Sequence, residues 1–318
     1  MTDRNYIDML TYMRPEGSKY QRKFCNRYLM PVFGQPDKHG NYTHIVGDKP
    51  RIAFMAHHDT VHSKTGRQTV TIDGDYAKAT TDCLGADCTS GIYIMLCMIE
   101  AGIEGVYVVH AAEEVGCVGS KGLVSDFPAW IDHVDAAISF DRKGYDSIIT
   151  HQMGLRSCSD EFATSLSGIL ELGMNLDPTG SYTDSNEYVM DIAECTNISV
   201  GYFNQHTGQE NQDLVFLETL IDSLLNADWS KLVISRKAGD TEYAMGKKEK
   251  WSSKYWRNDD PWDNIAYCND DLDIKSIIRS NPDAIVTILQ SHGYTADSLI
   301  DEITDLGSTF KNPYYGYN

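Results

Sequence analysis

The stretch RIAFMAHHD (residues 51–59) decides the fold, because an apolar run ends there abruptly in polar side chains. Residues 52–56 have the composition and length of a buried strand. His57, His58 and Asp59 follow directly. Strands that are apolar throughout are typical of a parallel sheet that is covered on both faces. We therefore predict a buried strand that carries functional side chains at its carboxyl end.

The same alternation of strand and helix continues along the chain. Further strands are predicted at 41–46, 106–114, 134–142 and 196–203. Helices are predicted at 89–102, 159–173 and 211–229. The first thirty residues indicate two helical segments broken at 15–17. Strands that alternate with helices indicate a three-layer α/β/α fold with a mostly parallel central sheet.

The character of the sequence changes near residue 236. Residues 1–235 form the predicted α/β domain, and residues 236–270 read as a polar connector that contains Trp251, Trp256 and Trp262. These tryptophans are expected to anchor the connector to the domain. The alternative is that the connector folds over the mouth of a functional site. Residues 271–318 carry capping signals of two short helices and predict a small helical appendage. The appendage could mediate self-association, contact another partner, or do neither.

The composition is that of a globular protein with an acidic surface. The 318 residues are 42% hydrophobic and 23% charged, with a formal net charge of −19. This charge argues against a nucleic-acid partner, which requires a positive field. No stretch approaches the roughly 20 apolar residues that cross a bilayer, and the first residues do not resemble a signal peptide. We expect a cytoplasmic protein with no membrane contact and with reduced cysteines.

The first candidate for chemistry is the pair His57 and Asp59. Alternate residues of a strand share a face, so these two side chains are expected to point together and His58 away from them. A metal-bound imidazole commonly donates its other N–H to a carboxylate. The pair alone is more typical of a hydrogen-bonded structural histidine. His58 is expected to pair with Thr60 or His62, or to pack behind the sheet edge.

Four more segments add polar side chains next to predicted strands and helices. They supply Asp87 in a glycine-flanked turn before a helix, then Glu113 with Glu114, Asp141 and His206. Adjacent acids after an apolar run are costly unless a cation neutralises them. Together with His57, this inventory fits two borderline metal ions that share a bridging carboxylate, each with one imidazole. The alternative is a chance set of surface polar groups.

At this point the chain resembles a known family, the dinuclear zinc exopeptidases, which include aminopeptidases and enzymes of the peptidase T and glutamate-carboxypeptidase type. The resemblance covers residues 5–230. It depends on an ordered set of motifs, of which no single member is specific: AHHDTV (56–61), LGADCTSG (84–91), AAEEVGCVGS (111–120), SFDRKG (139–144), YTDSNEY (182–188) and NISVGYFNQHT (197–207).

The resemblance implies a role for each matching residue. His57 and Asp141 would hold one metal ion, and Glu114 and His206 the other. Asp87 would bridge the two ions. In addition, Asp59 would support His57, and Glu113 would be the general base and acid. The domain over residues 1–235 would then be the catalytic domain.

The implied chemistry is hydrolysis of an amide bond assisted by two divalent ions, most simply Zn²⁺, with Co²⁺ or Mn²⁺ as alternatives. Such ions polarise the carbonyl and lower the pKa of a bound water from about 15.7 to about 7. Glu113 would take the water's proton and pass it to the leaving amine. The expected enzyme is an aminopeptidase that acts on a small peptide. The alternatives are a carboxypeptidase, an N-acyl amino acid deacylase, or a non-catalytic binding or scaffold protein on this fold.

The chain departs from the family's pattern in two places. A second acid usually follows the bridging aspartate, and Cys88 stands there instead. We favour a packed thiol over a soft metal ligand. The peptidase T and carboxypeptidase types also carry a large lid or dimerisation domain, whereas residues 142–205 leave no room for one. The architecture is therefore expected to be closer to the single-domain aminopeptidases.

Four residues near the motifs are candidates for substrate binding. Tyr182 and Asp184 fall in a segment that lines the substrate pocket in the family, although a helix-capping turn explains them equally well. Asn204 and Arg142 flank predicted metal ligands and could bind polar ends of a substrate. For Arg142 a salt bridge is the favoured alternative.

Overall fold

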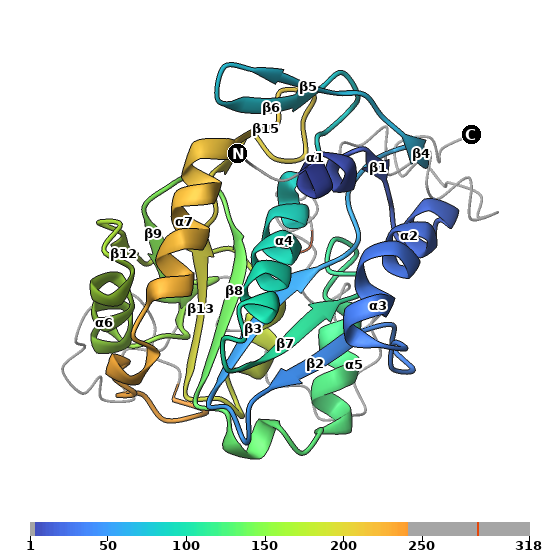
Figure 1. The fold of residues 1–318 in the computed structure, drawn as a ribbon. Coiled ribbons are helices and arrows are strands. Elements are labelled where there is room, and N and C mark those ends of the chain that lie inside the picture. Colours follow the sequence, from blue (N-terminus) through green and yellow to red (C-terminus); the bar gives the residue numbers. More distant parts are fainter. Residues whose placement is uncertain (1–3, 241–284, 286–318) are drawn as a thin grey trace, which may run out of the picture. The chain divides into compact units, whose positions relative to one another are not determined.

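A seven-stranded β-sheet forms the centre of the protein (Figure 1). The computed structural model describes residues 4–240 and residue 285. In spatial order the strands are β12 (Asn175–Asp177), β9 (Ser147–Ile149), β13 (Glu194–Ser199), β8 (Ala136–Arg142), β3 (Ile52–His57), β7 (Gly105–His110) and β2 (Tyr42–Val46).

The four central strands β13, β8, β3 and β7 run parallel. The edge strand β2 is antiparallel to β7. On the other side, β9 and β12 are parallel to each other, and β9 meets β13 in the antiparallel sense. The prediction of a mostly parallel sheet in an α/β fold is therefore confirmed.

Alternate side chains of the central strands enter two separate cores, one on each face of the sheet. In β3, Phe54 and Ala56 join one core, whereas Ala53 and Met55 join the other. This alternation explains why the strand has no polar residue before His57, since both of its faces are buried. The sheet is therefore the middle of three layers.

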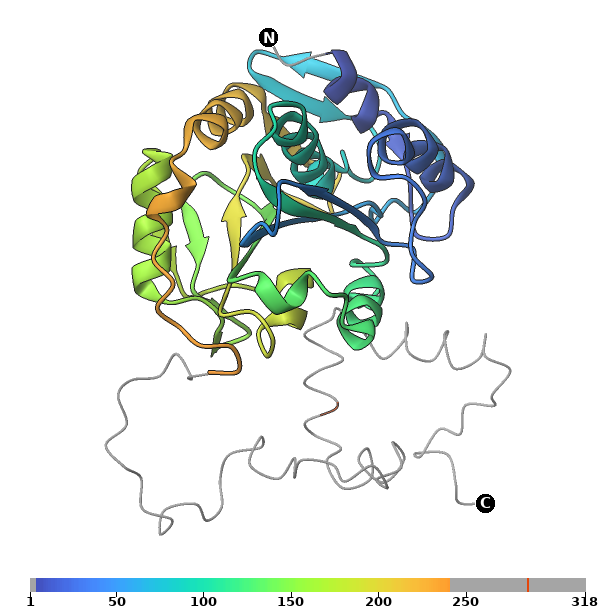
Figure 2. The same ribbon diagram turned by 60° about the horizontal axis from the view of Figure 1, so that its bottom comes forward.

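Helices cover both faces of this sheet. The helices are α1 (Arg4–Leu10), α2 (Lys19–Phe24), α3 (Met30–Phe33), α4 (Ala86–Glu100), α5 (Val118–Asp126), α6 (Asp160–Leu170) and α7 (Leu214–Asn226). Shorter turns are a π-helical segment η1 (Cys25–Leu29) and the 3-10 helices η2 (Ile131–His133), η3 (Asp184–Tyr188) and η4 (Trp229–Lys231). Figure 2 shows α4 in teal on one side of the sheet and α5 in green on the other.

Several predicted element boundaries differ from the structure. The bounds of helix α4 begin at Ala86, but the backbones of Asp87 and Cys88 are not helical, so the regular helix begins at the predicted residue 89. The strand predicted at 106–114 ends at His110, so Glu113 and Glu114 lie in the following loop, where Ala112 has φ +58°. Polar side chains at the sheet edge therefore come from loops as well as from strand ends.

A second sheet was not predicted. It has the strand order β14 (Tyr202–Phe203), β15 (Asn211–Asp213), β6 (Tyr76–Ala79) and β5 (Val70–Asp73). The single strand expected at 196–203 is in fact two, because β13 ends at Ser199 and the chain turns at Gly201, which has φ +89°. His206 consequently lies on a loop of the smaller sheet and not at the end of a central strand.

Two small antiparallel pairs complete the strands. Strand β1 (Tyr12–Met13) pairs with β4 (Gly66–Arg67), and β10 (His151–Gln152) pairs with β11 (Leu155–Arg156). Between Asp141 and His206, the chain forms only strands of the sheets, α6, η3 and connecting turns. This agrees with the expected lack of an inserted lid domain in this interval.

The predicted connector and appendage lie almost entirely outside the described residues. The chain divides into two units, Met1–Gly246 and Lys247–Asn318. The described start of the connector is attached to the domain, because Arg236 is buried and donates hydrogen bonds to the carbonyls of Val189 and Ile192. The tryptophans of the connector are not described.

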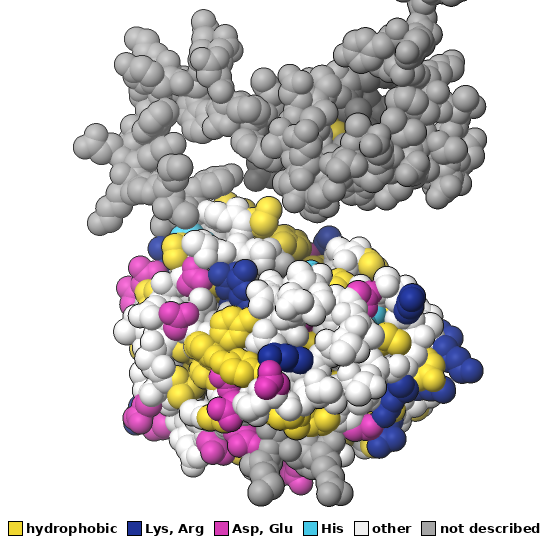
Figure 3. All heavy atoms as spheres, turned by 90° about the horizontal axis from the view of Figure 1, so that it is seen from above, with side chains coloured by type: hydrophobic (Ala, Val, Ile, Leu, Met, Phe, Trp, Pro, Cys, Tyr) yellow, Lys and Arg dark blue, Asp and Glu magenta, His cyan; other side chains and the backbone are white. Residues whose placement is uncertain are grey.

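The described surface carries mixed charges. Figure 3 shows one face, on which magenta acidic and blue basic side chains are interspersed with apolar ones. Within residues 4–240, no helix is long and apolar enough to cross a membrane. The seven cysteines of the described region are all free thiols, as expected.

Candidate metal centre

The predicted ligands converge at the carboxyl edge of the central sheet. His57 is the last residue of β3, and Asp141 is the last but one residue of the neighbouring parallel strand β8. Glu113 and Glu114 follow β7 on the other side of β3. Parallel strands present their carboxyl ends at one edge, which is why residues far apart in the sequence meet here.

Asp87 lies between the two histidines. Its Oδ1 atom is 3.0 Å from Nε2 of His57, and its Oδ2 atom is 3.2 Å from Nε2 of His206. Asp87 lies within the bounds of α4 but just before its regular part, because the backbones of Asp87 and Cys88 are not helical. Its carboxylate is therefore near the amino end of the regular helix, where the positive end of the helix dipole favours its ionised form. One carboxylate thus faces a separate imidazole with each of its oxygens.

The inner group consists of His57, Asp87 and Asp141. Nε2 of His57 is 3.6 Å from Oδ1 of Asp141, and Nδ1 of His57 is 3.4 Å from Oδ1 of Asp59. Asp59 also accepts hydrogen bonds of 3.1 Å from the backbone N–H groups of Glu113 and Glu114. It therefore connects the end of β3 to the loop after β7. It lies on the same side as Nδ1 of His57, although the 3.4 Å approach does not have hydrogen-bond geometry.

The outer group consists of Asp87, Glu114 and His206. Nε2 of His206 lies 3.1 Å from Oε1 of Glu114. The candidate ligand atoms of these three residues all lie within 4.8 Å of one another. The side chain of His206 is 45% exposed, whereas that of His57 is 1% exposed. The outer group therefore opens to solvent and the inner group does not.

Carboxylates outnumber cations at this edge of the sheet. Six acidic side chains surround the two histidines: Asp59, Asp87, Glu113, Glu114, Asp141 and Asp184. In the part of the chain that the structure describes, no Lys or Arg forms an ion pair with any of them. Crowded carboxylates without a cation are costly when they are buried.

The pKa values of these acids reflect that cost. Burial, reinforced by the charge of Asp87, raises the pKa of Asp141 to about 7. Burial raises the pKa of Asp184 to about 8 and the pKa of Glu113 well above its ordinary value. The carboxylates of Asp87 and then Glu114, which lie close to its ring, raise the pKa of His206 to about 11. Without a cation, these buried groups therefore tend to stay protonated, and a bound cation would replace their protons.

The donor set fits divalent ions of the zinc type. Each group combines one imidazole nitrogen with carboxylate oxygens, which are borderline to hard ligands. Oε1 of Glu114 is buried, and its 3.1 Å approach to His206 does not have hydrogen-bond geometry. This oxygen keeps a lone pair free for a cation. The inner and outer groups share Asp87, as a dinuclear centre requires.

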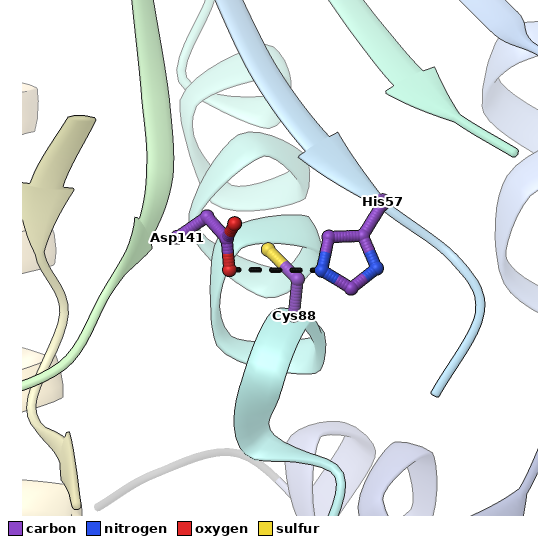
Figure 4. Close-up of side chains that lie close together, drawn as sticks. All are labelled: His57, Cys88 and Asp141. Carbon is purple, nitrogen blue, oxygen red and sulfur yellow. Dashed lines mark ion pairs between the residues drawn. The ribbon is translucent and has the colours of Figure 1, made fainter. Parts of the chain in front are cut away.

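Cys88 lies beside the inner group (Figure 4). Its Sγ atom donates a hydrogen bond of 3.1 Å to the carbonyl of Phe140, and the peptide bond between Asp87 and Cys88 is cis. Burial raises the pKa of Cys88 well above its ordinary value. The hydrogen bond to Phe140 engages the thiol with the backbone and favours the packed thiol over a metal ligand.

The YTDSNEY segment (182–188) reaches the site through two of its residues. Thr183 donates a hydrogen bond of 2.8 Å to Oδ2 of Asp141. Asp184 is buried and accepts a 2.6 Å hydrogen bond from Ser120. Tyr182 is 41% exposed and donates to Glu187. Of the two candidates for substrate binding in this segment, only Asp184 faces the acidic centre.

The other two candidates for substrate binding have different surroundings. Arg142 forms an ion pair of 3.0 Å with Asp177 and donates to Thr179, which is the alternative that the sequence favoured. Asn204 is exposed on the loop that carries His206, and its carbonyl accepts a hydrogen bond from Thr207. The guanidinium of Arg142 is therefore engaged by Asp177, whereas the Asn204 side chain is exposed to solvent.

His58 is a structural histidine. It is buried, with Nδ1 3.1 Å from Nε2 of Gln21 and Nε2 3.2 Å from the carbonyl oxygen of Gly40. The expected pairing with Thr60 or His62 is wrong, because those two residues bond to each other at 2.8 Å. The prediction that His58 packs behind the sheet edge is confirmed.

Sequence reasoning missed two residues that hold the ligands. Tyr202 donates a hydrogen bond of 3.2 Å to Oδ1 of Asp141. Glu210 is buried and binds the backbone of the turn that carries Asp87. Its only signal in the sequence is its place four residues after His206 in HTGQE, where an acid looks like a solvated loop residue.

Known proteins resemble the chain in fold but not in sequence. No family model and no curated protein matches the sequence. The aminopeptidase PepT from Bacillus cereus ATCC 10987 superposes with a TM-score of 0.54 at 14% identity, over 70% of this chain and 95% of that one. The TET1 peptidase from Pyrococcus horikoshii gives a TM-score of 0.55 at 15% identity, over 70% and 99%.

A tripeptidase from Staphylococcus aureus subsp. aureus Mu50 is similar to the same extent, with a TM-score of 0.54 at 13% identity, over 70% of this chain and 95% of that one. At identities this low the likeness establishes a common fold. The matches cover most of the length of each of these structures.

Proposed function

We propose that the protein is a metal-dependent aminopeptidase that acts on small peptides through two divalent ions, most simply zinc. One observation carries the proposal: the Asp87 carboxylate faces His57 with one oxygen and His206 with the other. The fold shared with an aminopeptidase, a tripeptidase and a TET peptidase supports it. His57 and Asp141 would hold one ion, Glu114 and His206 the other, and Asp87 both.

The bound ions would polarise the scissile carbonyl and make a water nucleophilic at neutral pH. The chain's own residues then handle the protons. Glu113 lies next to Glu114, and the candidate ligand atoms of Glu113, Glu114 and His57 all lie within 4.8 Å of one another. Its carboxylate accepts the proton of the attacking water and passes it to the nitrogen of the leaving amine. The same carboxyl group thus acts as the base in the first transfer and as the acid in the second.

The charge around the centre favours a substrate with a free amine. Two divalent ions balance four of the six carboxylate charges, so negative charge remains. Asp184 is buried among these acids and is the residue that we assign to the substrate's ammonium group. A substrate's terminal carboxylate would require a cation, and Arg142, the nearest candidate in the sequence, is engaged by Asp177. We therefore place the aminopeptidase ahead of the carboxypeptidase and the deacylase.

A panel of matched dipeptides tests this choice. The zinc-loaded full-length chain is assayed on a free dipeptide, its C-terminal amide and its N-acetyl derivative. We expect hydrolysis of the first two, loss of the activity with a chelator, and recovery with zinc. Cleavage of the acetylated form alone would identify a deacylase. Cleavage that requires a free C-terminus would identify a carboxypeptidase, and no cleavage of any peptide would favour a binding protein.

A further inference from the structure

Glu210 is the most heavily used acceptor near the centre. Its carboxylate is 2% exposed and accepts four backbone hydrogen bonds from consecutive residues. Oε2 accepts from the N–H groups of Leu84 at 2.8 Å and Gly85 at 3.0 Å. Oε1 accepts from the N–H groups of Ala86 at 2.9 Å and Asp87 at 3.2 Å. Both oxygens of the side chain are therefore committed to one turn.

These N–H groups belong to the turn that leads into α4. Gly85 has φ +75°, and the backbones of Asp87 and Cys88 are not helical, so this turn precedes the regular part of the helix. Buried N–H groups that have no acceptor are costly. Glu210 supplies the acceptors from more than 120 residues away and so fixes the backbone of Asp87.

Glu210 also belongs to the loop that carries His206. This loop joins β14 to β15, and the N–H of Glu210 donates to the carbonyl of Thr207 at 3.0 Å. His206 itself has φ +62°, a conformation in which a loop needs support. One side chain thus connects the turn of Asp87 to the loop of His206, the two segments that face each other in the outer group.

We propose that Glu210 is a positioning residue that sets the placement of His206 relative to Asp87, and thereby the affinity of the outer group for its ion. This inference depends on the proposed function, because it assumes that the outer group binds a metal. The four hydrogen bonds that the Glu210 carboxylate accepts come from backbone N–H groups, so it acts through the backbone. Partners that orient metal ligands typically change metal affinity by about 10–100-fold when they are lost.

The chain provides a matched control in Glu194. This residue is also fully buried, and it accepts hydrogen bonds from the N–H groups of Ser159, Ser235 and Arg236 and from the Ser159 hydroxyl. It is the first residue of β13, at the amino end of the strand and away from the metal centre. A change from Glu to Gln removes the same kind of acceptor at both positions.

The experiment compares zinc binding by the wild-type chain, Glu210→Gln and Glu194→Gln. Zinc is titrated into metal-free protein in competition with a chromophoric chelator, and circular dichroism checks the fold. We expect Glu210→Gln to weaken the binding of the outer zinc ion by about 10–100-fold. The affinity for the inner ion should fall less, because Asp87 serves both ions but only the outer one also depends on the loop of His206. Glu194→Gln should keep both wild-type affinities, although its thermal transition should fall as well.

The outcomes separate the two proposals. Wild-type protein that binds no zinc would contradict the proposed function. Wild-type protein that binds two ions, with Glu210→Gln binding both equally well, would overturn only the role of Glu210. If Glu194→Gln lost as much zinc affinity as Glu210→Gln, the loss would be a consequence of lower protein stability. That result would also overturn the role of Glu210. If Glu210→Gln does not fold, Glu210→Asp keeps the charge with a shorter reach and is expected to show the same selective loss.

Discussion

The inner and outer ligand groups share Asp87 but are held in different ways. In the inner group, His57 and Asp141 stand on adjacent parallel strands, and both oxygens of Asp141 accept hydrogen bonds, from Tyr202 and Thr183. In the outer group, Glu114 follows β7 in a loop, and His206 is half-exposed on a loop between two short strands.

The difference teaches that one group is built by the sheet and the other by loops. Once the sheet has folded, its neighbouring strands hold His57 and Asp141 in place, and both side chains are shielded from water. The outer ligands depend on contacts between loops, of which Glu210 supplies four to the turn of Asp87. We therefore expect the inner ion to bind more tightly than the outer one, since preorganised ligands lose less conformational freedom on binding.

The largest effect is expected from a residue that belongs to neither group of ligands. Glu113→Gln keeps the size of the side chain but removes the base, so kcat should fall by about 10²–10⁴-fold. Zinc content should stay at the wild-type value, because both ligand groups remain intact. Peptide hydrolysis and metal analysis on the same preparation check both points. Unchanged turnover would rule out Glu113 as the base, and lost zinc would place it among the ligands.

A smaller effect, confined to one ion, should distinguish the two groups. Zinc titrations of His57→Ala should retain only the weaker binding step, and those of His206→Ala only the tighter one. His58→Ala is the control, since His58 binds Gln21 and Gly40 instead of the acids. It should keep both steps and lose about 1–3 kcal/mol of unfolding free energy. If His57→Ala retained tighter zinc binding than His206→Ala, the outer ion would be the more tightly bound one, contrary to this expectation.

The inner group was largely predictable from the sequence. The apolar run that ends at His57 indicated a buried parallel strand, and the spacing of two predicted that Asp59 would lie on the same side as His57. Both features depend on the geometry of a single strand and on the rule that parallel strands end at one edge. Asp141 follows from the same rule applied to β8.

The support of the outer group was not predictable in the same way. Strands β14 and β15 are two and three residues long, too short to give a period, and β15 pairs with β6 from a distant part of the chain. Glu210 is charged and follows a glycine and a glutamine, so its burial follows only from four backbone donors in another segment. These features are tertiary, and local sequence patterns do not encode them.

Anomalous diffraction at the zinc absorption edge, from crystals of the zinc-loaded protein, tests the central claim most directly. The dinuclear centre predicts two peaks, one on each side of the Asp87 carboxylate: an inner peak beside His57 and Asp141, and an outer peak beside Glu114 and His206. Zinc peaks elsewhere on the molecule, with none at Asp87, would contradict the account.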